Sequence, residues 1–434
     1  MSLTAVVLPL TARLATLFAR CAAEPGALLL DSCDDHAGEY DFIFRQPVAM
    51  LTDTARWPQQ LARAMEQVPA YDGPADLPFQ GGLAGAFSYD AGRALEDLPE
   101  LARADIPLPE LAVGIYTQAL IQRRSDRTTW LLAPQHHIDE LQAFWLAEAE
   151  ASSAGEFLLT SVWQSNLSAT DYADRFQKIQ DYLLAGDCYQ INLAQRFTAE
   201  FSGDPWQAYL RLRERNNAPF SGFMRLEDGA IMSHSPERFL AVDPHGKVET
   251  KPIKGTRPRH DDPERDQQLA QELATSEKDR AENVMIVDLL RNDLSRLCLP
   301  GSVKVPRLFA VETYPAVHHL VSTVIGQLAD SNQAVELLAA CFPGGSITGA
   351  PKIRAMEIIE ELEPHRRSFY CGSLGYFSQH GQADTNIAIR TLVAAQNQIY
   401  CWAGGGIVAD SECADEYQET LDKVARILPV LAEH

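Results

Sequence analysis

Strand-forming runs separated by glycine and proline turns occur along the whole chain, and this pattern restricts the fold more than any other feature. Up to residue 145 the runs are short, whereas after residue 165 they alternate with segments of helical periodicity. This irregular mixture predicts an α+β or mixed-sheet protein instead of regular βαβ winding. The strands expected are 42–44, 83–89, 111–121, 128–132, 189–197, 222–226, 238–242, 248–252, 372–378, 388–394 and 399–403.

Helices are expected where apolar residues recur at three- and four-residue spacing. One of them opens at Ser168 or Thr170. The small, polar segment 148–155 between the two halves is typical of a linker and predicts a domain boundary there, with an N-terminal domain at residues 1–150. The other helices expected are 277–294, 334–340, 351–362 and 415–428.

The composition excludes several classes of protein. The 434 residues include 37 Lys and Arg against 59 Asp and Glu, a formal charge of -22, which disfavours nucleic acid and anionic membranes as partners. No run of 18 apolar residues and no clear signal sequence are found, so we expect no membrane association. The eight cysteines are scattered without a Cys-x-x-Cys pair, which predicts reduced thiols and a cytoplasmic location.

Carboxylates on two predicted helices suggest a metal site. Glu282 shares a helix face with apolar residues such as Ile286, where a carboxylate needs a partner. Glu416, Glu419 and Lys423 lie along one face of the last helix. Three carboxylates meeting in space would give the oxygen ligands that magnesium prefers. The alternative is a solvated face with a Glu419–Lys423 ion pair worth about 0.3–0.5 kcal/mol.

Two glycine-rich segments are candidate anion sites. In 399–406 a strand is expected to break at Gly404, Gly405 and Gly406, which would let a ligand approach the backbone and offer it N–H donors. The segment 342–352 ends at the start of a helix, so its backbone and Thr348 are candidates for holding a carboxylate or phosphate. It lacks the Gly-Lys-Ser/Thr ending of a P-loop, and an ordinary bulge or turn is the alternative in both places.

A lysine and a glutamate are candidates for covalent and acid–base chemistry. Lys254 stands between Ile253 and Gly255, and an apolar setting would lower its pKa and make it a nucleophile. Glu237 follows a proline turn and would be a general acid if it is partly buried. The commoner alternative for each is an ordinary surface charge, which for Lys254 would lie in a basic turn.

Taken together, these segments resemble the chorismate-utilising enzymes. The resemblance runs in order over residues 165–430, the predicted chorismate-binding catalytic domain, and the first 150 residues resemble the family's more divergent domain through 29–32 and 81–89. It implies an α/β protein with two large packed β-sheets, helices outside them and the substrate between them. The motifs that carry it are 186–195, Ser-Pro-Glu237, Pro-Ile-Lys254-Gly-Thr, 280–293, 319–322, 345–352, 370–376, 386–390, Gly404–Gly406 and 416–420.

The resemblance also implies roles for individual residues. Glu282, Glu416 and Glu419 correspond to the family's magnesium ligands, and His319 to a residue that packs near the substrate ring. The remaining positions correspond to anchors for the carboxylates and side chain of chorismate: Arg390, Tyr370, Thr348, Lys423 and the backbone of Gly404, Gly405 and Gly406.

A few positions distinguish the subtypes of the family. Lys254 is typical of aminodeoxychorismate synthases, whereas anthranilate synthases carry a small residue there. Gln190 replaces the lysine of relatives that activate water at C2, which disfavours isochorismate formation. The resemblance therefore implies that Lys254 adds at C2, Glu237 protonates the departing C4 hydroxyl and ammonia adds at C4, giving the precursor of para-aminobenzoate and folate.

The sequence also indicates the source of ammonia, and it leaves two other functions open. The chain has no Gly-x-Cys-x-Gly motif, so a separate glutamine amidotransferase subunit is expected to supply ammonia. Component I of anthranilate synthase, or a catalytically silent partner that regulates an amidotransferase, are the alternatives. Near Ser32, where anthranilate-forming relatives bind tryptophan, Asp31 replaces their usual glutamate, which leaves feedback inhibition open.

Overall fold

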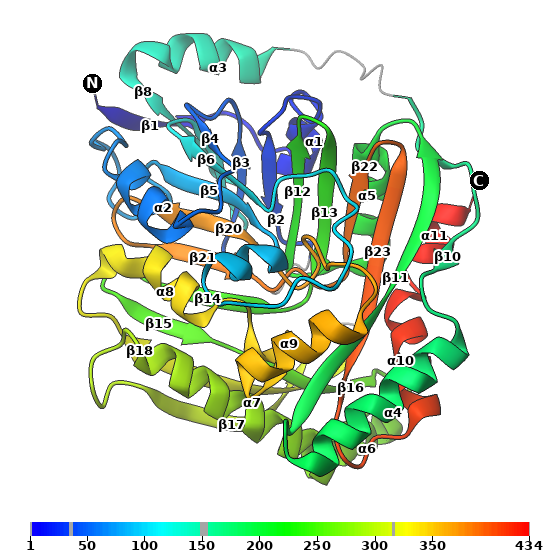
Figure 1. The fold of residues 1–434 in the computed structure, drawn as a ribbon. Helices are drawn as coiled ribbons and strands as arrows, with labels where there is room; N and C mark the ends of the chain where they lie inside the picture. The colour runs from blue at the N-terminus through cyan, green and yellow to red at the C-terminus, as the bar shows by residue number, and fades with distance from the viewer. Residues whose placement is uncertain (1, 34–37, 148–154, 315–316, 434) are drawn as a thin grey trace.

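Two large sheets form the centre of this protein. The structure is a computed structural model and describes residues 2–33, 38–147, 155–314 and 317–433. All strand pairs recorded in both sheets are antiparallel, and helices lie outside them (Figure 1). Phe42 of one sheet packs on Tyr376 of the other, with ring centroids 4.8 Å apart. The expected class, an α/β protein of two packed sheets with helices outside, is confirmed.

The first sheet has 13 strands in the described part of the chain. Its order in space is β1 (Leu3–Leu8), β8 (Thr129–Pro134), β7 (Ala119–Arg123), β3 (Tyr40–Phe44), β2 (Leu28–Asp31), β12 (Phe220–Leu226), β13 (Gly229–Ser235), β22 (Thr391–Ala395), β23 (Gln398–Ile407), β11 (Gln190–Ser202) and β10 (Gln164–Ser165), with β19 (Gly349–Ala350) and β9 (Leu158–Leu159) also paired to β11.

The second sheet has ten strands within the same described ranges. Its order is β16 (Ile253–Pro258), β18 (Val317–Gln327), β15 (Lys247–Thr250), β14 (Arg238–Val242), β21 (Ala383–Asn386), β20 (Ser373–Ser378), β5 (Gly82–Phe87), β6 (Leu111–Tyr116) and β4 (Met50–Leu51), with β17 (Lys304–Thr313) also paired to β18.

The helices begin and end close to the predicted positions where the sequence carried a periodic apolar stripe. Ser168 caps its helix by accepting the Asp171 backbone N–H, and Ser276 does the same for Asp279. The α-helices are α1 (Leu14–Phe18), α2 (Trp57–Met65), α3 (Ile138–Leu146), α4 (Ala169–Ala185), α5 (Pro205–Asn216), α6 (Pro263–Thr275), α7 (Glu277–Ser295), α8 (Ala334–Cys341), α9 (Lys352–Leu362), α10 (Cys413–Val424) and α11 (Leu428–Ala432), and the 3₁₀ turns are η1 (Tyr89–Ala94), η2 (Gln135–His137), η3 (Ser331–Gln333) and η4 (Gly345–Ile347).

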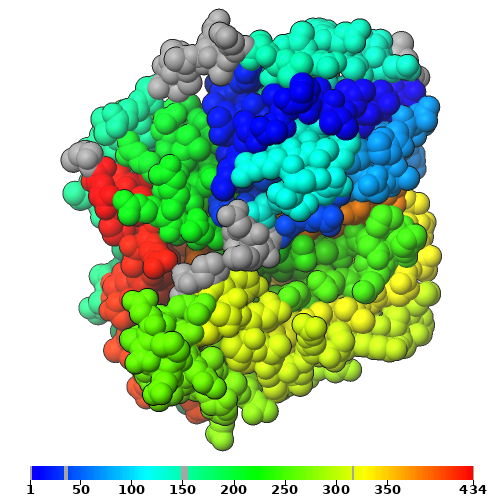
Figure 2. Space-filling view, turned by 180° about the vertical axis from the view of Figure 1, so that it is seen from behind, coloured from blue at the N-terminus to red at the C-terminus, as the bar shows by residue number. Residues whose placement is uncertain are grey.

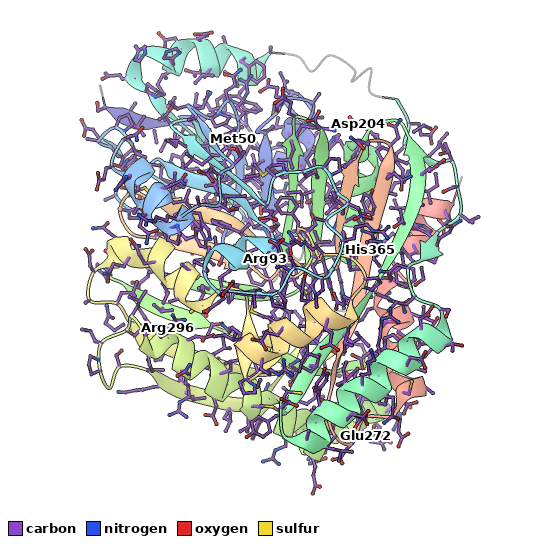
Figure 3. All side chains as sticks on the ribbon, in the orientation of Figure 1. Met50, Arg93, Asp204, Glu272, Arg296 and His365 are labelled. Carbon is purple, nitrogen blue, oxygen red and sulfur yellow. The ribbon has the colours of Figure 1, made fainter. Side chains whose placement is uncertain are left out.

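Each sheet combines strands from before residue 147 with strands from after residue 164. In the first, β2 pairs with β12, and in the second, β5 pairs with β20. The view from behind shows the blue N-terminal segments packed directly on green and yellow segments (Figure 2), and side chains fill the space between the layers (Figure 3). The predicted linker falls mostly on residues 148–154, which lie outside the described residues, so the division at residue 150 stays a prediction.

The structure differs from the expected strands in three places. The run 111–121 is two strands, β6 and β7, which belong to different sheets. The segment around Lys254, which was not among the expected strands, is the strand β16. β23 does not break at its glycines, because Gly404, Gly405 and Gly406 all pair with β11. In each case pairing with a distant strand satisfies backbone groups in a way that local sequence does not reveal.

The state of the cysteines and the character of the helices relate to the expectations drawn from composition. All eight cysteines are free thiols. Within the described ranges, no helix combines the length and the apolar character needed to span a bilayer.

A buried ion pair fixes the elements that surround the later site. Arg367 is 1% exposed and binds both carboxylate oxygens of Glu363, at 2.9 and 2.7 Å. The same guanidinium donates to the carbonyls of Asn192 in β11 and Ile347 in η4, while Glu363 also accepts the backbone N–H of Ala194. The pair therefore holds β11 against the loop that contains η4.

Replacing Arg367 with methionine should destabilise the protein strongly, because it leaves the Glu363 carboxylate buried without its cation. Loss of one partner of a buried pair costs about 3–5 kcal/mol. Arg123→Met, which breaks the exposed pair with Asp126, is the matched control and should change stability little. Urea unfolding followed by fluorescence measures both, and equal midpoints for the two variants would contradict this account.

Candidate active site

A cavity of about 590 Å³ opens between the two sheets, within the size range of small-molecule sites. It is lined by segments far apart in the chain, including β16, α7, β23 and α10. Of the fourteen predicted site residues, twelve line it, while Thr348 and Gln190 lie just behind its wall. The twelve are Glu237, Lys254, Glu282, His319, Tyr370, Arg390, Gly404, Gly405, Gly406, Glu416, Glu419 and Lys423.

Lys254 and Glu237 meet beside the residue Ser346. The Lys254 ammonium donates to the Ser346 carbonyl at 3.2 Å, and the Glu237 carboxylate is hydrogen bonded to the Ser346 side chain and the Ile253 backbone. The setting of Lys254 is therefore not the apolar one expected from its neighbours in sequence. Because β16 pairs with β18, the Lys254 side chain reaches into a cavity that also holds carboxylates.

Glu237 has the protonation behaviour of a general acid. Its side chain is 6% exposed, and burial raises its pKa to about 7 although Lys254 and the hydrogen bonds from Ser346 and Ile253 act to lower it. A carboxylic acid with such a pKa keeps its proton near neutral pH and is able to give it to a leaving group.

The cavity also contains a cation without a counter-ion. No hydrogen bond or ion pair involves the Arg390 guanidinium within the part of the chain that is described, and burial lowers its pKa. The backbone of Arg390 adopts a φ of 49°, in the left-handed region that a non-glycine residue rarely occupies. This unpaired charge in a concave site is suited to binding a carboxylate.

Aromatic rings form another part of the wall. Tyr370 is buried and stacks on Trp402, with ring planes 3° apart and centroids 6.0 Å apart. His319 bonds to Thr256 through Nδ1, and burial lowers the His319 pKa to about 4. At neutral pH the imidazole is therefore uncharged, and it is able to pack on a ring without adding positive charge.

The acidic part of the cavity comes from α7 and α10, as expected. Glu416 is buried and accepts hydrogen bonds from Ser411 at 2.6 Å and from Lys278 at 3.3 Å. Burial would raise the Glu419 pKa, but Lys423, 2.6 Å away, lowers it below the ordinary value. Burial raises the pKa of Glu282. Lysines thus neutralise part of the acidic charge.

These carboxylates are not arranged as a complete metal centre. Among the described residues, no group of three His, Cys, Asp or Glu side chains is close enough to hold a metal ion. Glu416 and Glu419 are nevertheless adjacent, because one oxygen of each lies 3.0 and 3.3 Å from the point where a Cβ on Gly405 would be. Their oxygens match the chemistry of a hard divalent cation.

Two predicted residues lie behind the wall, and several residues that line the cavity were not predicted. The Thr348 hydroxyl donates to the Gly344 carbonyl at 2.9 Å inside its own loop, and Gln190 is fully buried. Lys278 and Asn192 line the cavity but were not among the candidates. Lys278 lies one turn before Glu282 on α7, and Asn192 follows Gln190 by two on a strand, so periodicity would have indicated both.

Comparison with known proteins decides the family. The family described as chorismate binding enzyme matches residues 26–429. The chain belongs to this family.

Individual members of the family show the extent of the similarity. Aminodeoxychorismate synthase component 1 of Escherichia coli K12 is 51% identical over 95% of both chains. Anthranilate synthase component 1 of Streptomyces coelicolor is 38% identical over 95% of this chain and 85% of its own. The crystal structure of anthranilate synthase component I from Streptococcus pneumoniae matches with a TM-score of 0.81 and 29% identity, over 90% of this chain and 92% of that one.

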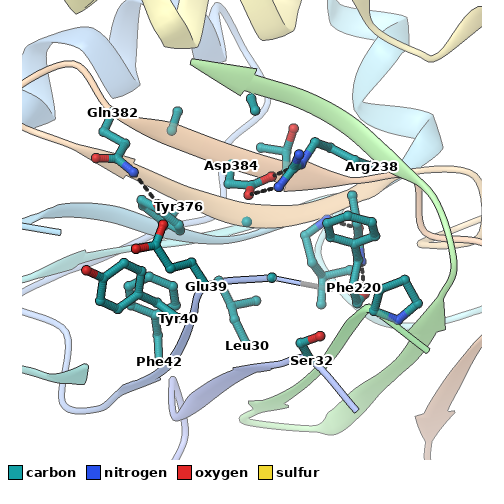
Figure 4. Close-up of a pocket in the computed structure, with 18 of the residues that line it drawn as sticks. Leu30, Ser32, Glu39, Tyr40, Phe42, Phe220, Arg238, Tyr376, Gln382 and Asp384 are labelled. Atoms are coloured by element: carbon teal, nitrogen blue, oxygen red, sulfur yellow. Dashed lines mark hydrogen bonds and ion pairs between the residues drawn. The ribbon is translucent and has the colours of Figure 1, made fainter. Parts of the chain in front are cut away.

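A second cavity of about 320 Å³ is lined by residues of β2, β3, β14, β20 and β21, among others (Figure 4). Ser32, Asp31 and Tyr376 line it, together with the Arg238–Asp384 ion pair. Asp31 is already occupied by Arg213, which binds both of its carboxylate oxygens. The predicted pocket near Ser32 is therefore present, in a place separate from Lys254.

The raised pKa of Glu237 predicts a stability change with a defined pH dependence. In the unfolded chain the carboxyl ionises near pH 4.5, whereas in the folded protein it ionises near 7. Burying the charge therefore costs stability progressively as the pH rises between these values, by roughly 3 kcal/mol at most above pH 7. Glu237→Gln should raise Tm at pH 8 and lose this advantage near pH 4.5.

Differential scanning calorimetry between pH 4.5 and 8 measures this effect. Glu200→Gln on the exposed end of β11 is the matched control, and its Tm should follow the wild type throughout. If Glu237→Gln lowered Tm equally at both ends of the range, the carboxyl would not be buried as an acid.

Proposed function

We propose that this chain aminates chorismate at C4 with ammonia to give 4-amino-4-deoxychorismate, the precursor of para-aminobenzoate in folate biosynthesis. The observation that carries the proposal is Lys254 beside Glu237 in one cavity, in a chain 51% identical to an aminodeoxychorismate synthase component 1 over 95% of both sequences. The reaction class is a transfer of an amino group to chorismate.

The charges in the cavity suit a substrate with two carboxylates. The unpaired Arg390 supplies one cation, and Lys254, Lys278 and Lys423 supply others in a chain whose net charge is -22. Concentrating cations in a concave site attracts an anion despite the opposing net charge. Tyr370, Trp402 and neutral His319 offer flat, uncharged surfaces for the ring.

Lys254 and Glu237 would divide the chemistry at the ring. The Lys254 amine forms a bond to C2, the ring double bonds shift, and the C4–O bond breaks as Glu237 gives its proton to the departing hydroxyl, which leaves as water. Ammonia then forms a bond to C4, the ring double bonds shift back, and the C2–N bond breaks with its electron pair returning to the Lys254 amine. The proton that the new amine loses goes back to the Glu237 carboxylate. The enolpyruvyl group is retained.

A magnesium ion fits the oxygen donors of Glu282, Glu416 and Glu419. Bound there, Mg²⁺ would neutralise their charge and bind a carboxylate of the substrate. In the substrate-free protein Lys278 and Lys423 pair with Glu416 and Glu419, so these ammonium groups balance the acidic wall before a cation arrives. The three glutamates would hold the metal, and binding of the cation would replace these two lysine contacts.

Removing one carboxylate should weaken magnesium binding without unfolding the protein. Mg²⁺ should raise the wild-type Tm, because a ligand that binds only the folded state stabilises it. Glu416→Gln should lower Mg²⁺ affinity by more than roughly tenfold and abolish both the Tm shift and activity. Glu412→Gln, exposed just before the same helix, is the control. Isothermal titration calorimetry measures affinity, and full activity in excess chelator would contradict the site.

A partner is proposed as the ammonia source. The name of the Escherichia coli relative, component 1, indicates a second component, and the chain itself lacks a Gly-x-Cys-x-Gly motif. We infer that this component is a glutamine amidotransferase subunit. The cytoplasm, where chorismate and glutamine are available, remains the predicted location.

Product identification tests the function through Lys254. With chorismate, Mg²⁺ and ammonium salts, the wild type should yield 4-amino-4-deoxychorismate, and glutamine should replace ammonium only when the amidotransferase is added. Lys254→Ala should reduce this product by orders of magnitude, since the C2 nucleophile is gone. Lys254→Arg should not rescue it, because a guanidinium stays protonated. Lys251→Ala, whose ammonium pairs with Glu312, is the control.

Chromatography and mass spectrometry separate the possible outcomes. Anthranilate from the wild type would assign the chain to anthranilate synthase component I. No product with any amine donor would indicate a silent regulatory partner. Near-normal aminodeoxychorismate from Lys254→Ala would remove the covalent step and leave Lys254 with an electrostatic role.

A further inference from the structure

Two buried amides on β11 have polar atoms without partners. Gln190 is 0% exposed, and neither its amide oxygen nor its amide nitrogen has a hydrogen-bond partner within the described ranges. Asn192 is 6% exposed, lines the cavity, and its Oδ1 also has no partner among these residues. Leaving such a group unsatisfied costs about 1–3 kcal/mol each, so these amides need an explanation.

The neighbouring strand provides space for both side chains. Residues 190 and 192 lie on the same face of β11, because side chains alternate along a strand. Asn192 pairs with Gly406. A Cβ on Gly404 would lie 2.7 Å from Asn192 Oδ1, and one on Gly406 would lie 2.4 Å from Gln190 Nε2. The glycines that were expected to bind an anion thus also make room for two amides.

The backbone of Asn192 is held from both sides. Its N–H donates to the Thr348 carbonyl at 2.9 Å, and its carbonyl accepts from the buried Arg367 at 2.7 Å. The amide is therefore presented from a fixed strand position, which reduces the ordering cost of binding a small molecule.

Asn192 and Lys254 contact the same loop. The Lys254 ammonium donates to the Ser346 carbonyl, and the Asn192 backbone N–H donates to the Thr348 carbonyl two residues later. Ser346, Ile347 and Asn192 line the same cavity as Glu237 and Lys254. A molecule held by the Asn192 amide would therefore share this cavity with the ring on which Lys254 acts.

We propose that Asn192, with Gln190 behind it, forms the site that holds ammonia for attack on the ring, an inference that rests on the proposed function. The carboxylates of chorismate need donors and cations, which Arg390 and the lysines supply. Ammonia has three N–H donors and suits an amide oxygen. A carboxylate at the same place would favour ammonium, which has no lone pair and cannot attack, whereas a neutral amide leaves ammonia uncharged.

Variants of Asn192 separate ammonia binding from substrate binding. Asn192→Leu should raise KM for ammonium at least tenfold at fixed pH while leaving the chorismate dissociation constant within twofold of wild type. Asn192→Asp keeps the shape and the acceptor but adds charge, so it should lower kcat at saturating ammonium. Gln190→Leu should raise KM for ammonium in the same direction.

Stability gives a second readout. Replacing an unsatisfied buried amide with an apolar side chain removes a desolvation penalty, so the Tm of Gln190→Leu should equal or exceed that of wild type. The matched controls are Asn332→Leu and Asn332→Asp on the exposed turn η3, which should leave both kinetic constants unchanged. If Asn192→Leu does not fold, Asn192→Ser gives the same test with a smaller change in shape.

The outcomes distinguish this inference from the function itself. A wild type that makes no aminodeoxychorismate overturns the proposed function. An active wild type whose KM for ammonium is unchanged in Asn192→Leu and Gln190→Leu overturns the ammonia site and leaves an amide that binds only water. Loss of chorismate affinity in Asn192→Leu also overturns it, because the amide would then bind the substrate.

Discussion

The antiparallel ladder between β11 and β23 is the constraint on which the site depends. It runs from the Ile191–Ile407 pair to the Glu200–Gln398 pair, straight through three glycines. On one face, missing side chains at Gly404 and Gly406 accommodate the amides of Gln190 and Asn192. On the other face, Gly405 lets the carboxylates of Glu416 and Glu419 approach the strand. The two faces of one regular ladder therefore carry neutral amides and acidic groups beside the same cavity, and any slip in its register would exchange the two faces.

The sequence predicted those features that local pattern controls. Ser168 and Ser276 cap helices where expected, and the spacing of Glu416 and Glu419 placed them on one face of α10. Glu237 was interpreted as a general acid on the condition that it is partly buried, and its side chain is buried in the structure. The size of the pKa shift was not predictable, because it depends on contacts with Ile253, Lys254 and Ser346 that the residues next to Glu237 in sequence do not specify.

The remaining features depend on long-range pairing. No local feature of the sequence distinguishes glycines that end a strand from glycines that lie within one. At Gly405 the pairing with β11 keeps the strand β23 continuous. Likewise, the apolar run 111–121 shows no sign that its halves belong to different sheets. Lys254 was assigned an apolar setting from its neighbours in sequence, whereas its neighbours in space are a carbonyl and carboxylates. The role of each residue in the site follows from contacts that local sequence does not specify.

The interleaving of early and late strands has a consequence for how the chain is made. β5 finds its partner β20 only after residues 88–372 have been synthesised, which takes roughly 15–60 s at ribosomal speed. Throughout that interval β5, whose side chains are all buried in the finished protein, has an unpaired edge. Exposed apolar edges of this kind pair with other chains. Newly made molecules should therefore depend on chaperones that shield the nascent chain, and expression at low temperature, where aggregation slows, should improve the yield of folded protein.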